Sequence, residues 1–278
     1  YWHTCDVCMI GANVSVFSIG KAVGGGGGGL PLASFLHLKD PATNFSSNSW
    51  TASVGGSPSF SGAFATGTDA NGNSYLQYST DSQQTSYGSL ASVTLPSNMC
   101  IISVVEEEGS RGFIVEHSTN ANTIDGMYHF SSTNYTYGTR RAASSSALVG
   151  YNPLNSAGSS IEDPVDNATK TIFGSNLKSD NSMIGMFYSS KFGGKRNGTI
   201  STGSAISHSN TTNTLYIGSR AGSSQMFTGK LYEVYITEQL TDEQFDQVIA
   251  YFEAKYNGPP AWQYSGTRFS LSAQVLVP

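Results

Sequence analysis

"LTDEQFDQVIAYFEAKYNGPP", residues 240–260, describes one helix in a chain that otherwise consists of short apolar segments separated by Ser, Thr, Asn and Gly. Thr241 can cap the first turn, and Gln244 can return the hydrogen bond in a capping box. Apolar residues then recur at helical spacing and form one stripe, which comprises Phe245, Val248, Ile249, Phe252 and Tyr256. An Asn-Gly pair followed by prolines ends the pattern. The stretch predicts a helix over about 241–256.

Strand-like segments fill most of the chain before this helix. They are short, rich in β-branched and aromatic residues, and bounded by Gly, Asn, Asp or Ser, as in "SYLQYS" and "KTIFGS". Such segments without intervening helices favour an all-β sandwich over a parallel α/β sheet. "CIISVV", residues 100–105, is apolar on both faces and predicts a central strand. Alternation in "KLYEVYIT" predicts two faces, one with Leu231, Glu233 and Tyr235 and the other with Tyr232, Val234 and Ile236.

The composition excludes several classes of function. Charged residues make up 12% of the 278 residues, and the net charge is −5. Nucleic-acid binding is not expected, because phosphates select for clustered Lys and Arg. No stretch approaches the roughly 18 consecutive apolar residues of a membrane helix, so we expect a soluble protein without membrane insertion.

The chain is expected to have three parts. Residues 1–30 form an N-terminal arm that ends in an uninterrupted glycine run, Gly24 to Gly29, which we interpret as a hinge. The arm is too short to bury a core alone, so the main domain or another chain must cover its apolar side. Residues 31–258 form the sandwich, and residues 259–278 form a C-terminal extension. The first residues lack an initiating Met and a basic stretch, so we expect a fragment or processed product rather than a signal peptide.

The cysteines do not form a disulfide framework, because their number, 3, is odd. Cys5 and Cys8 follow His3 at a spacing that metal ligands use, and Cys100 could complete a zinc site. A lone C-x-x-C motif without a second pair is a weak signal. The simplest interpretation of Cys100 is a small buried hydrophobe.

The end of the chain resembles the C-terminal signature of the concanavalin A-like (laminin G-like) jelly-roll superfamily. The matching pieces are "YIG" at 216–218, "FTGKLYEV" at 227–234, "LT" at 240–241 and "YFEAKY" at 251–256. The resemblance implies an all-β fold, a two-sheet antiparallel jelly-roll sandwich with one C-terminal helix and, here, an extended N-terminal arm. Loops at the rim of the concave sheet would be available for ligands. Members bind sugars or proteins, form parts of enzymes or serve as structural modules, so the fold does not decide the function.

Two acidic patterns bear on chemistry that the resemblance implies. Some enzymes of the superfamily hydrolyse glycans with paired carboxylates, which lie about 5 Å apart when configuration is retained. The candidates here are Glu106, Glu107 and Glu108, but a turn follows at once, and a charged strand end that blocks edge pairing is the favoured interpretation. Laminin G-like domains often hold calcium at a rim loop. One loop has side-chain oxygens at every second position, a spacing that lets them converge on a hard cation. These residues are Asp69, Asn71 and Asn73.

An Asn-Gly hairpin turn explains that calcium pattern equally well. A second acidic loop of similar weight contains Glu162, Asp163 and Asp166. An aromatic cluster is the candidate ligand site, because aromatic faces stack on sugar rings; its members are Tyr128, Phe130, Tyr135 and Tyr137. The favoured alternative is that these aromatic residues stabilise a hairpin through cross-strand pairs.

These observations favour a non-enzymatic virion structural or adhesion protein, such as a bacteriophage fibre, decoration or tail-associated protein. We expect a homo-oligomer at a virion surface or in the extracellular space, with other subunits bound through the arm and host glycans as candidate ligands. No cofactor is expected apart from the candidate calcium ion. A secreted or cell-surface carbohydrate-binding module is the alternative, and a glycoside hydrolase or lyase is a third hypothesis.

Overall fold

The computed structural model describes residues 35–78, 85–96, 98–108, 112–118, 126–132, 136–142, 170–178, 183–189, 193–197 and 211–256. The predicted arm and C-terminal extension lie outside these residues. So do Cys5, Cys8, Tyr135 and the acidic loop at 162–166. The division into arm, sandwich and extension therefore stays a prediction.

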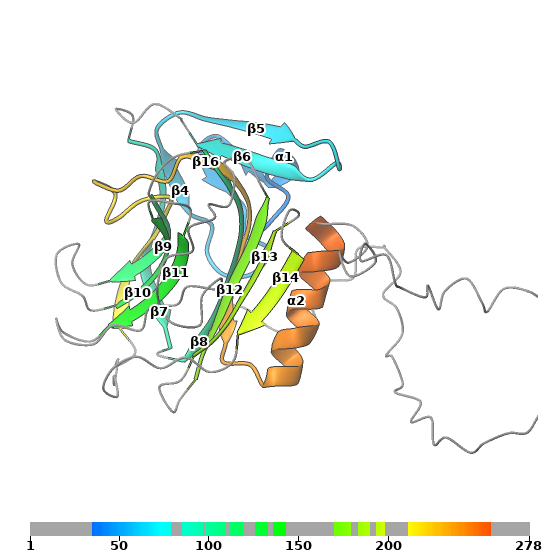
Figure 1. The fold of residues 1–278 in the computed structure, drawn as a ribbon. Coiled ribbons are helices and arrows are strands. Elements are labelled where there is room, and N and C mark those ends of the chain that lie inside the picture. Colours follow the sequence, from blue (N-terminus) through cyan, green and yellow to red (C-terminus); the bar gives the residue numbers. More distant parts are fainter. Residues whose placement is uncertain are drawn as a thin grey trace, which may run out of the picture. The chain divides into compact units, whose positions relative to one another are not determined.

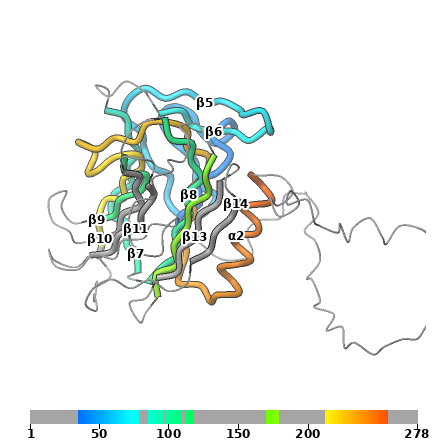
Figure 2. The backbone as a smooth tube through the Cα atoms, viewed as in Figure 1, coloured from blue at the N-terminus to red at the C-terminus, as the bar shows by residue number. Residues whose placement is uncertain are grey.

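The described strands form two antiparallel sheets of eight strands each (Figures 1 and 2). Sheet A has the order β14 (Gly193–Asn197), β13 (Met183–Ser189), β12 (Thr171–Leu177), β8 (Met99–Glu107), β16 (Gly229–Glu238), β6 (Ser74–Tyr78) and β5 (Phe64–Thr68), with β1 (Leu36–Leu38) also paired to β16. Sheet B has the order β11 (Thr136–Ala142), β10 (Gly126–Ser132), β9 (Gly112–Ser118), β15 (Thr211–Ile217), β7 (Tyr87–Leu95), β4 (Ser59–Ser61), β3 (Ser49–Trp50) and β2 (Phe45–Ser46). The all-β sandwich prediction is confirmed.

The core lies between the two sheets. Sheet A contributes side chains such as Ile101 and Phe173, and sheet B contributes Leu215 and Ile217. Strand β8 is buried along its whole length between β12 and β16, so the predicted central strand is confirmed. Cys100 lies on this strand as a free, fully buried thiol, and burial raises its pKa. Its expected role as a small hydrophobe therefore holds.

The late helix is α2 (Asp242–Tyr256), and it covers the face of sheet A that points away from sheet B (Figure 1). The capping box forms as predicted: Gln244 N donates to Thr241 Oγ1 at 3.2 Å, and Thr241 N donates to Gln244 Oε1 at 2.9 Å. The predicted stripe is buried at every position, from Phe245 to Tyr256. No described helix is long and apolar enough to cross a membrane. A four-residue helix, α1 (Pro41–Asn44), was not predicted.

The prediction that side chains alternate strictly between the two faces is wrong at the start of β16. The register against β8 shifts between Leu231 and Glu233, as at a β-bulge. One extra residue in a strand reverses the faces of the residues before it. Leu231 therefore joins Val234 and Ile236 in the core, whereas the Tyr232 ring packs against α2, 5.9 Å from the Tyr256 ring. The bulge gives the helix one more aromatic contact from the sheet.

Candidate functional site

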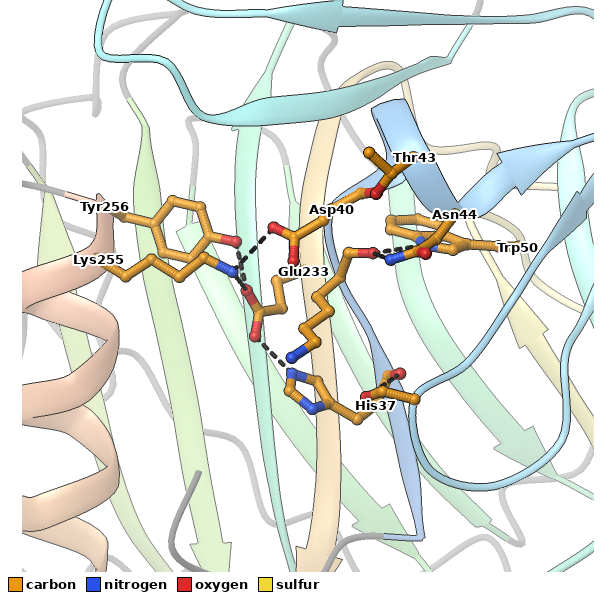
Figure 3. Close-up of polar contacts among 10 residues, drawn as sticks. His37, Asp40, Thr43, Asn44, Trp50, Glu233, Lys255 and Tyr256 are labelled. Carbon is orange, nitrogen blue, oxygen red and sulfur yellow. Dashed lines mark hydrogen bonds and ion pairs between the residues drawn. The ribbon is translucent and has the colours of Figure 1, made fainter. Parts of the chain in front are cut away.

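A buried polar cluster joins α2 to the sandwich, and Glu233 is its centre (Figure 3). Glu233 Oε1 lies 2.6 Å from His37 Nε2 on β1. Its other carboxylate oxygen, Oε2, accepts from Lys255 Nζ at 2.6 Å and from the Tyr256 hydroxyl. Lys255 Nζ also lies 3.3 Å from Asp40 Oδ1, in the segment between β1 and α1. One carboxylate thus connects the first strand, a central strand and the helix.

The carboxylate of Glu233 is paired with a cation although it is completely buried. Burial alone raises the pKa of Glu233, but the His37 hydrogen bond and the Lys255 charge outweigh it, and the pKa is lowered. Because an ionised carboxylate only accepts, His37 must carry a proton on Nε2. Burial lowers the pKa of Lys255, and Glu233 more than reverses this, so that pKa is raised. The cluster is a satisfied ion pair without solvent access at its centre, which suits a structural role.

The carboxylates that sequence reasoning considered for catalysis are engaged with a cation. Glu106 Oε1 is ion-paired with Lys230 Nζ, and its Oε2 accepts from the Tyr232 hydroxyl at 2.9 Å. Glu108 lies 3.8 Å from the same ammonium and accepts from Gln77 Nε2 at 3.0 Å. The idea that these residues block an edge is wrong, because β8 is central and Glu106 pairs with Lys230 on β16.

The loop considered for calcium is the turn between β5 and β6, so the hairpin interpretation is confirmed. Asp69 Oδ1 accepts from the backbone N–H groups of Asn71 and Asn73, each at 2.9 Å. Asp69 Oδ2 is ion-paired with the buried Lys170 ammonium. Burial raises the pKa of Asp69, but the Lys170 hydrogen bond and the turn's backbone N–H groups lower it further than burial raises it. A cation of the chain itself therefore occupies the place beside Asp69.

Further oxygen and ring contacts hold Lys170 in that place. Its Nζ donates to Tyr256 O at 3.3 Å, and the Asn73 amide oxygen lies 3.0 Å away in the orientation that satisfies both ends of that amide. The ammonium also lies 4.9 Å from the Tyr232 ring centre. A divalent ion at Asp69 would meet this positive charge at close range, so the structure argues against calcium here.

Because α2 covers sheet A, the outward face of sheet B is the broad sheet face that no other described element covers. Tyr216 lies on this face, because its neighbours Leu215 and Ile217 belong to the core. Directly paired residues share a face in antiparallel sheets. The register therefore defines an outward row across β4, β7, β15 and β9, which comprises Ser59, Ser89, Tyr216 and Glu116.

The aromatic residues predicted to stack on sugars are only partly brought together. Tyr128 is the backbone partner of Glu116 in the register, and Phe130 is the partner of Phe113 of β9. Tyr137 pairs with Ser131 rather than with either of them, and Tyr135 lies outside the described residues. The stacking role of these residues stays a prediction.

A turn that was not predicted from the sequence contacts the outward row. This rim turn, residues 218–225, follows β15 and leads toward β16 (Figure 1). The buried carboxylate of Glu116 accepts from the Ala221 N–H group, and Ser219 Oγ accepts from Gly222 N at 3.1 Å. Gly222 rests on two half-buried rings, since a Cβ there would come within 3.0 Å of Tyr87 and 3.2 Å of Tyr216. Glu116, Tyr87 and Tyr216 thus contact the turn directly.

Compared by sequence, the chain matches no protein-family model and no curated protein. Its fold is similar to domain 4 of AbnA, a GH43 extracellular arabinanase from Geobacillus stearothermophilus, with 11% identity and a TM-score of 0.53 over 78% of this chain and 98% of that one. The binding domain of botulinum neurotoxin serotype D is similar with 12% identity and a TM-score of 0.50, over 82% of this chain and 54% of that one. These likenesses show a shared β-sandwich fold alone.

Replacing Glu233 by Gln tests the buried cluster. Removing one partner of a buried ion pair leaves a charge without compensation, so we expect a loss of about 3–5 kcal/mol in the free energy of unfolding. Urea denaturation followed by circular dichroism measures it. Glu243→Gln, at an exposed position of the same helix, is the matched control. A loss within about 0.5 kcal/mol, the range of ordinary surface substitutions, would contradict the assignment.

The same cluster predicts the direction of acid sensitivity. The folded pKa of Glu233 lies below its ordinary value of 4.5, so its contribution to stability is fully present above pH 4.5. That contribution is lost as pH falls through the folded pKa. The stability difference between the wild type and Glu233→Gln should therefore shrink as the medium is acidified. A difference that grows toward low pH would have the wrong sign.

Calcium should not stabilise the β5–β6 turn. We expect the melting temperature to be the same with excess CaCl2 and with EDTA, because Lys170 already neutralises Asp69. Lys170→Met should lower it, whereas Lys178→Met, at a more exposed ion pair, should have little effect. A calcium-dependent rise that Asp69→Asn abolishes would restore the calcium hypothesis.

Proposed function

We propose that this chain is a non-enzymatic surface or adhesion protein whose β-sandwich binds carbohydrate at the outward face of sheet B. One observation carries the proposal: α2 covers sheet A, while the face of sheet B presents half-buried tyrosines beside a turn that a buried carboxylate holds in place. Protein sites for sugars combine apolar ring faces with a few oriented polar groups.

The polar composition of this face supports the same proposal. Ser59 and Ser61 are exposed, and Ser89 lies between Ser59 and Tyr216 in the outward row. Further along, Thr94 Oγ1 and Thr212 Oγ1 lie 2.7 Å apart at the surface. Hydroxyl groups can donate and accept hydrogen bonds, which matches the hydroxyls of a sugar.

The state of the acidic residues favours a non-enzymatic protein over a glycoside hydrolase or lyase. Paired-carboxylate hydrolysis needs one protonated acid and one free carboxylate at the reacting bond. Glu106 and Glu108 instead share the Lys230 ammonium, and Glu233 is completely buried. Within the described residues, no group of at least three His, Cys, Asp and Glu side chains could hold a metal ion.

The virion part of the proposal rests on the sequence of residues 1–30. Their apolar side needs a cover, and the glycine run Gly24 to Gly29 allows the arm to reach another subunit. We propose that the arm joins copies of the chain in a bacteriophage fibre, decoration or tail-associated assembly, with the sandwich displayed outward. A secreted or cell-surface binding module would use the same sheet face.

Tyr216→Ala tests the sugar-binding face. Arabinotriose, with which the arabinanase domain was solved, and a neutral glycan array are suitable probes. Ring stacking in a polar site contributes a large share of weak sugar affinity, so we expect binding to fall at least tenfold in calorimetry. Tyr251→Ala, on α2 at the opposite side, is the matched control and should bind as the wild type does.

A double variant distinguishes the predicted hairpin aromatics from the tyrosines beside the rim turn. If Tyr135→Ala with Tyr137→Ala abolishes binding while Tyr216→Ala does not, the site lies at the predicted hairpin rather than at the rim turn. No binding of the wild-type chain to any glycan would contradict the carbohydrate proposal.

Deleting residues 1–23 tests the role of the arm. We expect the full chain to form a multimer and the truncated chain to be monomeric, because the arm supplies the apolar contact between subunits. Light scattering after size exclusion measures the mass of both. A truncated chain that assembles as the full chain does would contradict this part of the proposal.

A further inference from the structure

Two polar groups of the rim turn are buried without a hydrogen-bond partner. They are Arg220 Nε, a donor, and Gln225 Oε1, an acceptor. Buried polar groups are nearly always paired, and each exception calls for an explanation. Among the described residues, Arg220 also has no carboxylate within ion-pair distance, although its guanidinium is charged at every physiological pH. One short turn therefore carries a donor and an acceptor that the described residues leave without a hydrogen bond.

Both residues contact Phe113, Gln225 through its backbone oxygen and Arg220 through its side chain. The Phe113 N–H group donates to Gln225 O at 3.0 Å, and the Phe113 ring centre lies 5.8 Å from Arg220 Cζ. Glu116, the carboxylate that does contact the turn, binds the Ala221 N–H group. Because Glu116 is paired with Tyr216 in the outward row, the turn that it binds lies beside Tyr216. Arg220 therefore lies against an aromatic ring, and no carboxylate of the described residues neutralises it.

The backbone of the turn is strained at residues other than glycine. Ala221 has φ 51° and Gln225 has φ 48°, both in the left-handed region. Such strain collects at ligand clamps, where the surrounding contacts hold it in place. Here Glu116 and the bonds between Arg220 and Ser224, which include Arg220 N to Ser224 O at 2.8 Å, supply those contacts. The turn is preorganised before any ligand arrives.

We propose that the rim turn recognises an anionic saccharide. A carboxylate or sulfate group on the sugar would bind Arg220, a hydroxyl would donate to Gln225, and the ring would rest on Tyr87 and Tyr216, whose ring centres lie 6.1 Å apart. This inference rests on the proposed sugar-binding face and names its ligand class. The chain carries a net charge of −5, so attraction of an anionic sugar must come from a local cation rather than from the overall field.

The test uses the full chain and four probes: polygalacturonate, dextran sulfate, unmodified dextran and arabinotriose. The first two distinguish a carboxylate from a sulfate, and the last two are neutral. We expect Arg220→Met to weaken binding of the preferred anionic probe roughly 10- to 100-fold, because hydrogen bonds to charged groups are strong, and to weaken neutral binding much less. Arg220→Lys should recover only part of the loss, since an ammonium lacks the guanidinium fork.

Lys178→Met is the matched control, because it removes one positive charge at an ion pair with Asp242 on α2. Equal weakening by Lys178→Met and Arg220→Met would overturn the inference and indicate unspecific charge attraction. Equal wild-type affinity for anionic and neutral probes would overturn it too, while leaving the sugar-binding face intact if Tyr216→Ala still abolishes binding. Absence of binding to all four probes would overturn this inference, and absence of binding on the glycan array as well would also contradict the carbohydrate proposal.

Stability provides an independent readout. Removing a buried donor that lacks a partner relieves its desolvation penalty, so Arg220→Met should keep or raise the melting temperature while it reduces binding. A lower melting temperature together with unchanged anionic binding would assign Arg220 a packing role on Phe113 and overturn the inference.

Discussion

The carboxylate of Glu233 is the interaction on which the arrangement of the molecule depends. It is completely buried, so it must be compensated, and the compensating groups come from β1 and from the last turn of α2. Removing Lys255 leaves the carboxylate in the interior without its cation. The cluster therefore specifies where the helix lies on sheet A, beyond what the apolar stripe alone would specify. It also connects the segments "FTGKLYEV" and "YFEAKY", since Glu233 binds Lys255 and Tyr256.

This position of the helix decides which surface is left for function. Sheet A has its inner face in the core and its outer face under α2. Sheet B shares the core but keeps its outer face uncovered by the other described elements. Glu116 then does on sheet B what Glu233 does on sheet A: a buried carboxylate on a strand holds a segment that is remote in sequence. On sheet A the segment is α2, which covers the outer face. On sheet B the segment is the rim turn, which lies beside the outer face.

The sequence was informative where local rules decide the structure. The capping box at Thr241, the buried stripe of α2 and the central position of β8 follow from spacing and composition, and the structure has all three. Alternation failed at Leu231 because a bulge depends on the pairing with β8, which a single strand does not reveal. The partners of Asp69 and Glu106 were likewise hidden, because Lys170 and Lys230 reach them through tertiary contacts. The rim turn was missed for the same reason: Tyr87 and Gly222 meet only after the sheets form.

Hydrogen–deuterium exchange of the full chain, with and without polygalacturonate, tests the central claim that the open face of sheet B, and not the helix-covered sheet, recognises sugars. The claim requires slower exchange in peptides that cover β7 and the rim turn, with unchanged exchange across α2. Protection across α2, with none at the rim turn, would contradict it.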